Sequence, residues 1–208
     1  MTRRWMVGVA ALCMSVAGVL NAAETAVAKN PLLDALQAAY AAESSAKVRN
    51  EAFAAKADAE GYKSVAGLFR ALAKSEGLHA EHHAGMIKKI GAEPKAAEDK
   101  PEVKSTQDNL EAAVKAATTA KDTMYPALVK QVEAEKDAAG ATMSFKGAAA
   151  IADTNIKLCQ LALKDLEGWK AVGKEFLVCG VCGYVTADQK IEKCPICAAP
   201  RTKFELVK

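Results

Sequence analysis

The C-terminal segment contains two C-x-x-C pairs, and no other feature of this sequence restricts the fold as strongly. The pairs are Cys179–Cys182 and Cys194–Cys197, with the segment 183–193 between them. Each pair can present two sulfurs to one metal, so two pairs at this spacing predict a tetrahedral four-thiolate site. Two disulfides are the alternative in an exported protein. The spacing alone does not distinguish zinc from iron.

The sequence before these pairs predicts long helices. Only 5% of the chain is aromatic and alanine is abundant, a composition that favours helices over strands. Asn30-Pro31 caps the first helix and Ser105, with Asp108, caps the third, whereas Pro126 is expected to kink or briefly end the third. Apolar periodicity places the four helices at about residues 32–60, 65–90, 106–124 and 143–166.

A long linker, residues 91–104, connects the second predicted helix to the third. Four helices of this length with a long middle crossover predict a mainly α, ferritin-like four-helix bundle. The chain then divides into a signal peptide, the bundle and a small cysteine-rich domain, at residues 1–22, 27–170 and 174–208.

The N-terminal segment, residues 1–22, has the character of a cleaved export signal. Arg3 and Arg4 precede an apolar stretch that ends in small residues near Ala22. The run Thr2–Val7 is also similar to a twin-arginine signal, although an ordinary signal beginning with two arginines fits as well. We therefore expect a periplasmic or otherwise exported protein. Its mature form should have no membrane span, because the apolar stretch is too short for one.

Charge argues against nucleic acid as a partner. Lysine and arginine total 28 and acidic residues total 25, so the formal net charge is only +3. A nucleic-acid surface needs a strongly basic patch, and two of these basic residues belong to the predicted signal.

The cysteine-rich segment resembles the rubredoxin-type module of rubrerythrins. The resemblance rests on C-x-x-C-G-Y at residues 179–184, C-P-x-C at 194–197 and the following Ala-Pro-Arg-Thr-Lys-Phe-Glu. It implies one iron held by Cys179, Cys182, Cys194 and Cys197. Ala198 departs from the pattern, because glycine usually supplies the positive φ at that place.

The predicted bundle resembles the same family. Glu43-Ser-Ser-Ala, Phe69-Arg, Glu76-Gly-Leu-His79 and Met124-Tyr-Pro match its helices. Such bundles hold two irons with one Glu from each of two helices and Glu-x-x-His from each of the others. The resemblance therefore makes Glu43, Glu76 and His79 candidate metal ligands.

The second half of that ligand set is missing. The family pattern places its remaining glutamates and its second Glu-x-x-His on positions that carry no suitable donor here: Ala117, Ala120, Ala152 and Asn155. Asp122 and Asp153 are nearby carboxylates off the ligand-bearing face. We therefore expect no coupled di-iron centre, and at most a second, weakly bound metal in the bundle.

His83 is a further candidate for such a single-metal site. It lies four residues after His79 and so can share its helical face with Glu76 and Glu43. The alternative is that His82 and His83 are solvated near the helix end. Without a metal, the two glutamates would need a cation such as Lys121 or would have raised pKa values.

Two functions compete on these observations. The first is an exported non-haem iron protein that transfers single electrons through the four-cysteine site. The second is a rubrerythrin-type peroxide reductase that uses an altered bundle site. A zinc-stabilised structural protein is a third and weaker possibility. The family resemblance also implies a homodimer and a redox partner protein.

Overall fold

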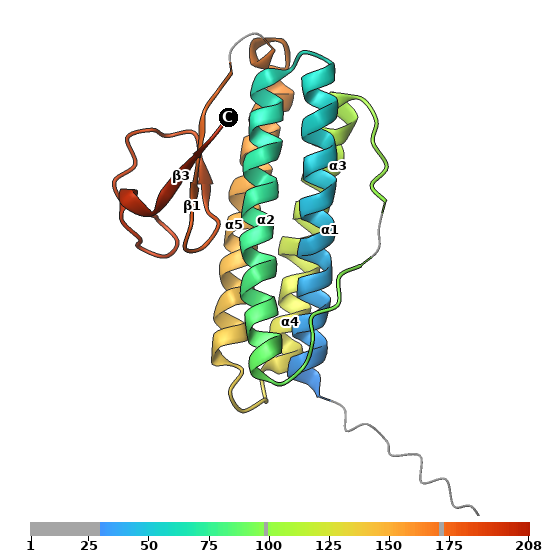
Figure 1. The fold of residues 1–208 in the computed structure, drawn as a ribbon, viewed down its shortest axis with the longest axis vertical. Helices are drawn as coiled ribbons and strands as arrows, with labels where there is room; N and C mark the ends of the chain where they lie inside the picture. The colour runs from blue at the N-terminus through green and yellow to red at the C-terminus, as the bar shows by residue number, and fades with distance from the viewer. Residues whose placement is uncertain (1–29, 98–99, 171–172) are drawn as a thin grey trace, which may run out of the picture.

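The computed structural model describes residues 30–97, 100–170 and 173–208, and the predicted signal lies outside these ranges. The long helices stand side by side as a bundle, and a small β unit packs against one side of it (Figure 1). None of the helices in the described ranges is both long and apolar enough to span a membrane.

The bundle confirms the predicted fold class. Its helices are α1 (Pro31–Ala59), α2 (Lys63–Lys89), α3 (Thr106–Thr119), α4 (Tyr125–Val132) and α5 (Ala139–Lys164). Gly61, at φ 82°, makes the tight turn between α1 and α2. The linker then runs back along α1 (Figure 1), so α3 starts beside the end of α1 and runs antiparallel to it.

The interruption near Pro126 takes the form of a π-helical turn. The segment η1 (Ala120–Met124) joins α3 to α4, and the N–H of Tyr125 bonds back to the carbonyl of Ala120. Proline cannot donate a helical hydrogen bond and its ring crowds the carbonyl four residues earlier. A wider turn relieves this conflict, so the predicted kink becomes a bulge in one continuous helix.

Helix α3 is anchored by capping interactions. Asp108 donates its N–H to Ser105 Oγ at 3.2 Å, which confirms Ser105 as the N-cap, and the Asp108 carboxylate accepts from the Ser105 hydroxyl at 2.6 Å. Glu60, at the end of α1, accepts from both the N–H (2.8 Å) and the hydroxyl (2.6 Å) of Thr106. These bonds, with Lys56, lower the pKa of Glu60 to about 2.

The lowered pKa of Glu60 predicts a pH-dependent contribution to stability. A carboxyl group whose pKa falls on folding stabilises the protein at pH values above its unfolded pKa, here 4.5. This contribution is lost as the pH falls towards the folded pKa of about 2. We expect Glu60→Gln to lower the unfolding free energy by about 1 kcal/mol at pH 7 and to have little effect near pH 2. Urea titrations at both pH values, with the exposed Glu133→Gln as control, test this; equal losses at both would contradict it.

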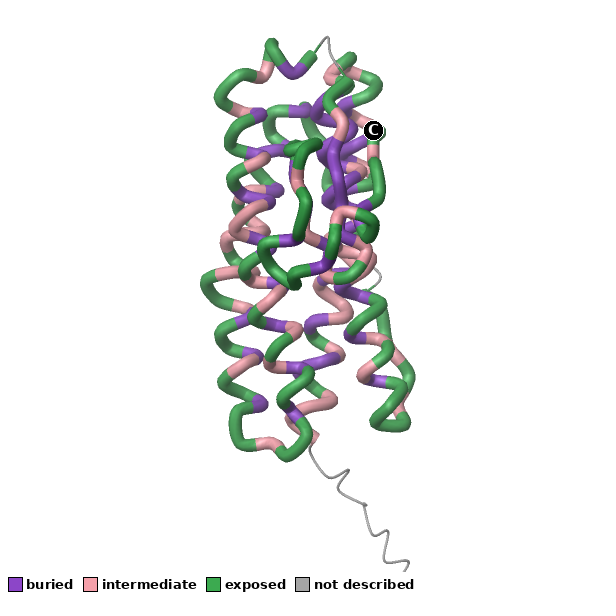
Figure 2. The backbone as a smooth tube through the Cα atoms, turned by 90° about the vertical axis from the view of Figure 1, so that its left-hand side faces the viewer, coloured by how far each residue is buried: buried purple, intermediate pink, exposed green. Residues whose placement is uncertain are grey.

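Two apolar clusters fill the ends of the bundle. One gathers residues such as Phe53, Phe69 and Leu110, and the other gathers Leu36, Ile87 and Phe145. Buried positions recur along the helices and continue into the β unit (Figure 2). Between the clusters lies a layer of buried polar side chains, of which Glu43, Asn50, His79 and Asn155 are members.

The β unit is a three-stranded antiparallel sheet in the order β2-β1-β3, formed by β1 (Phe176–Cys179), β2 (Val185–Thr186) and β3 (Phe204–Val207). The 3₁₀ turns η2 (Glu167–Trp169) and η3 (Arg201–Lys203) complete the elements. Phe176 and Val178 belong to the same apolar cluster as α2. Arg70 bonds the Lys208 carbonyl and Lys74 pairs with Glu205. The unit is therefore packed directly on the bundle.

Candidate metal centres

The four cysteines converge at one end of the β unit. Cys179 ends β1, Cys182 follows in the first turn, and Cys194 and Cys197 flank the second turn. All four sulfurs lie within 4.8 Å of one another, with Cys179 to Cys197 at 3.7 Å and Cys182 to Cys194 at 3.5 Å. A disulfide is ~2.05 Å long, whereas a tetrahedron of ~2.3 Å metal–sulfur bonds has edges of about 3.8 Å. The donor set therefore fits one tetrahedral metal.

Backbone N–H groups stabilise these sulfurs. Burial raises the pKa of Cys179, and hydrogen bonds from the N–H groups of Val181 and Cys182 offset only part of this rise. At Cys197 burial also raises the pKa, but hydrogen bonds that include the Ala199 N–H outweigh it, so the pKa is lowered. Ala198, just before, has φ 62°, as its place in the motif predicts. An L-residue in this conformation costs about 1 kcal/mol.

The second cluster lies in the middle of the bundle. Glu43 comes from α1, and Glu76 and His79 come from successive turns of α2. His79 Nδ1 is 3.5 Å from Glu43 Oε1 and 3.3 Å from Glu76 Oε2, and Tyr125 donates its hydroxyl to Glu43. One ligand atom from each of the three residues lies within 4.8 Å of the others, so the cluster could hold one metal.

The other nitrogen of His79 faces the four-cysteine site. Nε2 lies 3.0 Å from the carbonyl oxygen of Cys182. A carbonyl only accepts, so Nε2 carries the proton, and Nδ1 is left to face the carboxylates. A histidine ligand commonly donates its second N–H to a carbonyl in this way. His79 thus connects the two candidate metal centres directly.

Without a metal, the bundle cluster forms an internal ion pair. Burial raises the pKa of Glu43 to about 8, and the Glu76 carboxylate adds to the rise. Burial lowers the pKa of His79, but Glu43 and Glu76 outweigh it and raise the value to about 10. Burial raises the pKa of Glu76, yet its bonds to His79 leave it lowered. A metal bound at Nδ1 would displace a proton from this pair.

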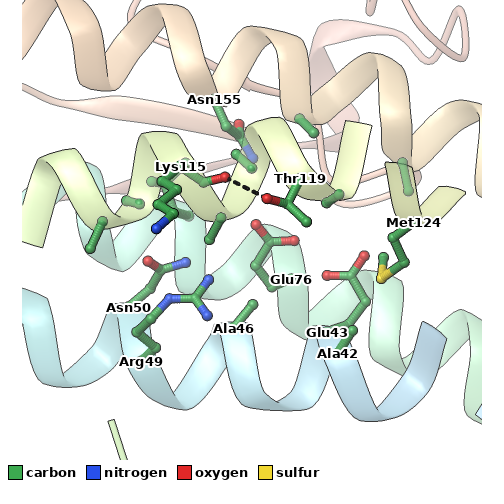
Figure 3. A pocket seen from close by; sticks show the side chains of 18 of the residues that line it. Ala42, Glu43, Ala46, Arg49, Asn50, Glu76, Lys115, Thr119, Met124 and Asn155 are labelled. Carbon is green, nitrogen blue, oxygen red and sulfur yellow. Dashed lines mark hydrogen bonds between the residues drawn. The ribbon is translucent and has the colours of Figure 1, made fainter. Parts of the chain in front are cut away.

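The opposite wall of the bundle offers no comparable donors. The positions at which the family pattern places its other ligands line the same pocket, across from Glu43 and Glu76: Ala117, Ala120, Ala152 and Asn155. Figure 3 shows Asn155 pointing into this pocket from α5. The amide of Asn155 is a poor metal ligand. The three donors present therefore all come from α1 and α2.

Other candidate residues lie elsewhere. His83 is fully buried against Phe145, with ring centroids 5.4 Å apart, so it is not solvated beside the exposed His82 as one interpretation predicted. It is also not part of the three-residue cluster, because it lies one turn further along α2. Lys121 pairs with Asp153 at 3.2 Å and not with the glutamates.

Besides His79, a second cation acts on the two glutamates: Arg49, which sequence reasoning missed. Burial lowers the pKa of its guanidinium, whereas Glu76 and Glu43 raise it. Asn50 was missed as well, although it lies seven residues after Glu43 and therefore on the same face of α1. This seven-residue spacing was the sequence signal that places Asn50 beside the glutamate site.

The contact between the two centres depends on Gly183. Its φ is 83°, and a Cβ there would lie 2.8 Å from His79 Nε2 and 3.1 Å from Ser75 Oγ. We expect Gly183→Ala to lower the unfolding free energy by about 1 kcal/mol or more, from backbone strain and this clash, and to separate the β unit from α2. Gly85→Ala, at an open helical position, should instead stabilise by about 1 kcal/mol. Urea unfolding of both variants measures this; a neutral Gly183→Ala would contradict the close contact.

Family models match both the bundle and the cysteine-rich segment. The rubrerythrin family model matches residues 34–149, and the rubredoxin-like domain model of rubrerythrins matches residues 178–205. Rubrerythrin-2 of Clostridium acetobutylicum is 31% identical over 178 residues, which cover 83% of this chain and 94% of the relative. Nigerythrin of Nitratidesulfovibrio vulgaris is 29% identical over 187 residues, 88% of this chain and 89% of the relative.

A solved structure of nigerythrin in a mixed-valence state superposes with a TM-score of 0.78 at 26% identity, covering 96% of this chain and all of that one. Rubrerythrins bind iron, and the four-thiolate donor set described above suits that metal. The fold, the cysteine site and these similarities lead to one conclusion: the chain belongs to the rubrerythrin family.

Proposed function

We propose that this chain is an exported one-electron carrier whose electron enters and leaves at the four-cysteine site. The observation that carries the proposal is the asymmetry of the bundle. Glu43, Glu76 and His79 occupy one wall, while the facing positions are alanines and an asparagine. Half of a di-iron ligand set remains, so the bundle lacks the ligands for chemistry that needs two bridged metals.

A four-thiolate iron supplies a reversible one-electron couple when bound. The protein surrounds the site with hydrogen-bond donors, because the N–H groups of Val181, Cys182 and Ala199 point at the sulfurs. The apolar side chains of Val181 and Ile196 are exposed beside the sulfurs. Exposed apolar side chains of this kind suit contact with a redox partner protein. Nigerythrin has been solved in mixed-valence and all-ferrous states, which supports a redox role for iron here.

A rubrerythrin-type peroxide reductase is the second candidate, and one observation favours it. His79 links the Cys182 carbonyl on one side to Glu43 and Glu76 on the other. This contact would place a metal bound by the three residues next to the cysteine site. The reductase would then depend on a single bundle metal.

Kinetics of reoxidation separate the two candidates. We expect the reduced protein to pass electrons rapidly to a one-electron acceptor such as ferricyanide, and to react slowly with hydrogen peroxide. Glu76→Gln should change neither rate, because the glutamate belongs to the bundle site, and the exposed Glu133→Gln serves as its control. Rapid reoxidation by peroxide that Glu76→Gln abolishes would instead establish the reductase.

Export and assembly complete the proposal. The basic start and apolar stretch of residues 1–22 support a cleaved signal, and the family supports a homodimer through the bundle. The mature N-terminus of the protein from a periplasmic extract should lie near Ala23 or Glu24. Light scattering should give twice the mass of one mature chain, and a strict monomer at micromolar concentration would contradict the assembly.

A further inference from the structure

A chain of hydrogen bonds runs from the bundle into the first turn of the four-cysteine site. Its first donor is His79 Nε2, which lies 3.0 Å from the carbonyl oxygen of Cys182. The N–H of Gly183 belongs to the same peptide group, and it donates to the carbonyl of Cys179 at 2.8 Å. Cys179 and Cys182 both belong to the four-sulfur cluster. The imidazole therefore donates into the backbone that carries two of the four sulfurs.

The direction of the first bond is fixed by chemistry. A carbonyl oxygen only accepts, so Nε2 of His79 is the donor, and it stays the donor whether or not Nδ1 binds a metal. The contact is also shielded from water, because His79 is 5% exposed and Gly183 is buried. In a setting of low dielectric constant, each hydrogen bond polarises the next one in a chain.

The surrounding residues hold the imidazole in this position. Its Nδ1 atom lies 3.5 Å from a Glu43 oxygen and 3.3 Å from a Glu76 oxygen. Ser75 is the other polar side chain beside Gly183, but its buried hydroxyl has no hydrogen-bond partner among the described residues. The hydroxyl of Ser75 therefore does not share the donation to Cys182, which leaves it to His79.

This donation favours the reduced state of the cysteine site. Reduction of a four-thiolate iron adds one electron and therefore one negative charge. Hydrogen bonds and nearby charge are the means by which a protein sets the potential of such a site, and partners of the ligands tune a metal in the same way. The positive end of an N–H dipole directed at the site stabilises the added negative charge.

We propose that His79 is a positioning residue of the cysteine site, which raises the reduction potential of the iron through its hydrogen bond to Cys182. This inference rests on the proposed one-electron function. It gives the remaining wall of the bundle site a role that needs no second set of ligands, because Glu43 and Glu76 hold the imidazole against the β unit.

Redox titration of the iron-loaded full chain, followed by its visible absorption, tests the proposal. All samples are first treated with a mild chelator, so that loss of a bundle metal does not contribute. His79→Leu removes the donor at similar volume and should lower the equilibrium constant for reduction at least about tenfold, which is ~59 mV for one electron. His79→Gln can direct an amide N–H at the same carbonyl and should recover most of this shift. The exposed His82→Leu is the control on α2 and should leave the potential unchanged.

A second pair of variants covers the case in which His79→Leu does not fold. Asparagine keeps a polar side chain but is too short to reach the Cys182 carbonyl, so His79→Asn should have a lower potential than His79→Gln. A potential that stays unchanged in His79→Leu, or that is equal in the two amide variants, would overturn the inference. The proposed function would still stand in either case, because the iron would still cycle by one electron. A natural protein without a reversible one-electron couple would contradict both.

Nuclear magnetic resonance tests the contact without any substitution. Zinc takes the same tetrahedral thiolate set and is diamagnetic. In the zinc-loaded, ¹⁵N-labelled protein we expect a proton on His79 Nε2 that exchanges slowly with solvent. A proton on Nδ1 alone, or rapid exchange at Nε2, would refute the hydrogen bond and with it the proposal.

Discussion

Cys194→Ser is expected to remove the red colour of the iron-loaded protein and to unfold residues 176–208 while the bundle remains helical. Cys194 is buried, and its sulfur lies 3.5 Å from that of Cys182. Its replacement therefore removes one of the four thiolate ligands at the buried side of the site. A unit of this size has too small a core to fold without its metal. Only five buried residues form the cluster inside it.

The measurements are the visible spectrum, iron per chain and near-ultraviolet circular dichroism. Cys159→Ser is the matched control: this thiol is fully buried in α5, where burial raises its pKa to about 12, and it takes no part in the four-sulfur cluster. The control should keep both colour and iron. A natural protein that contains one zinc and no iron after growth with both metals would contradict the iron assignment, and a Cys194→Ser protein that stays red would contradict the ligand set.

Features set by local sequence were predictable. The C-x-x-C spacing, the positive φ of Ala198 and the caps at Asn30 and Ser105 each depend on a few neighbouring residues. The resemblance to rubrerythrins identified Glu43, Glu76 and His79, and the three-residue spacing placed Glu76 and His79 on one face of their helix. These interactions span at most a few turns, so a single sequence contains the information they need.

Features that depend on how segments distant in the sequence pack against each other were not predictable. Whether His83 is solvated depends on Phe145, which lies on α5 and is distant from it in the sequence. The contact between His79 and Cys182 likewise joins α2 to a turn of the β unit. Arg49 was overlooked because the larger charge effect on it comes from Glu76, which lies on the neighbouring helix α2. A cavity is also a property of several helices together, so the alanines indicated a lost metal site but not the space it left.

Restoring the missing ligands is the change with the second large expected effect. The triple variant Ala117→Glu, Ala152→Glu and Asn155→His should convert the bundle into a tight di-iron site. These positions line the pocket opposite Glu43 and Glu76, and the cavity has room for longer side chains. Carboxylates from opposing helices are what the bridged arrangement requires.

The unmodified protein should lose any bundle metal to a mild chelator and retain about one iron per chain at the cysteine site, whereas the triple variant should retain about three. Its two added irons should be magnetically coupled, and peroxide should reoxidise the reduced variant faster than the parent. A control triple variant, Gln107→Glu, Ala150→Glu and Gln160→His, adds the same groups at exposed positions of α3 and α5 and should bind no additional tight iron. Three chelation-resistant irons in the natural protein would show that Glu43, Glu76 and His79 suffice, because the facing wall of alanines would then be no obstacle to a coupled centre.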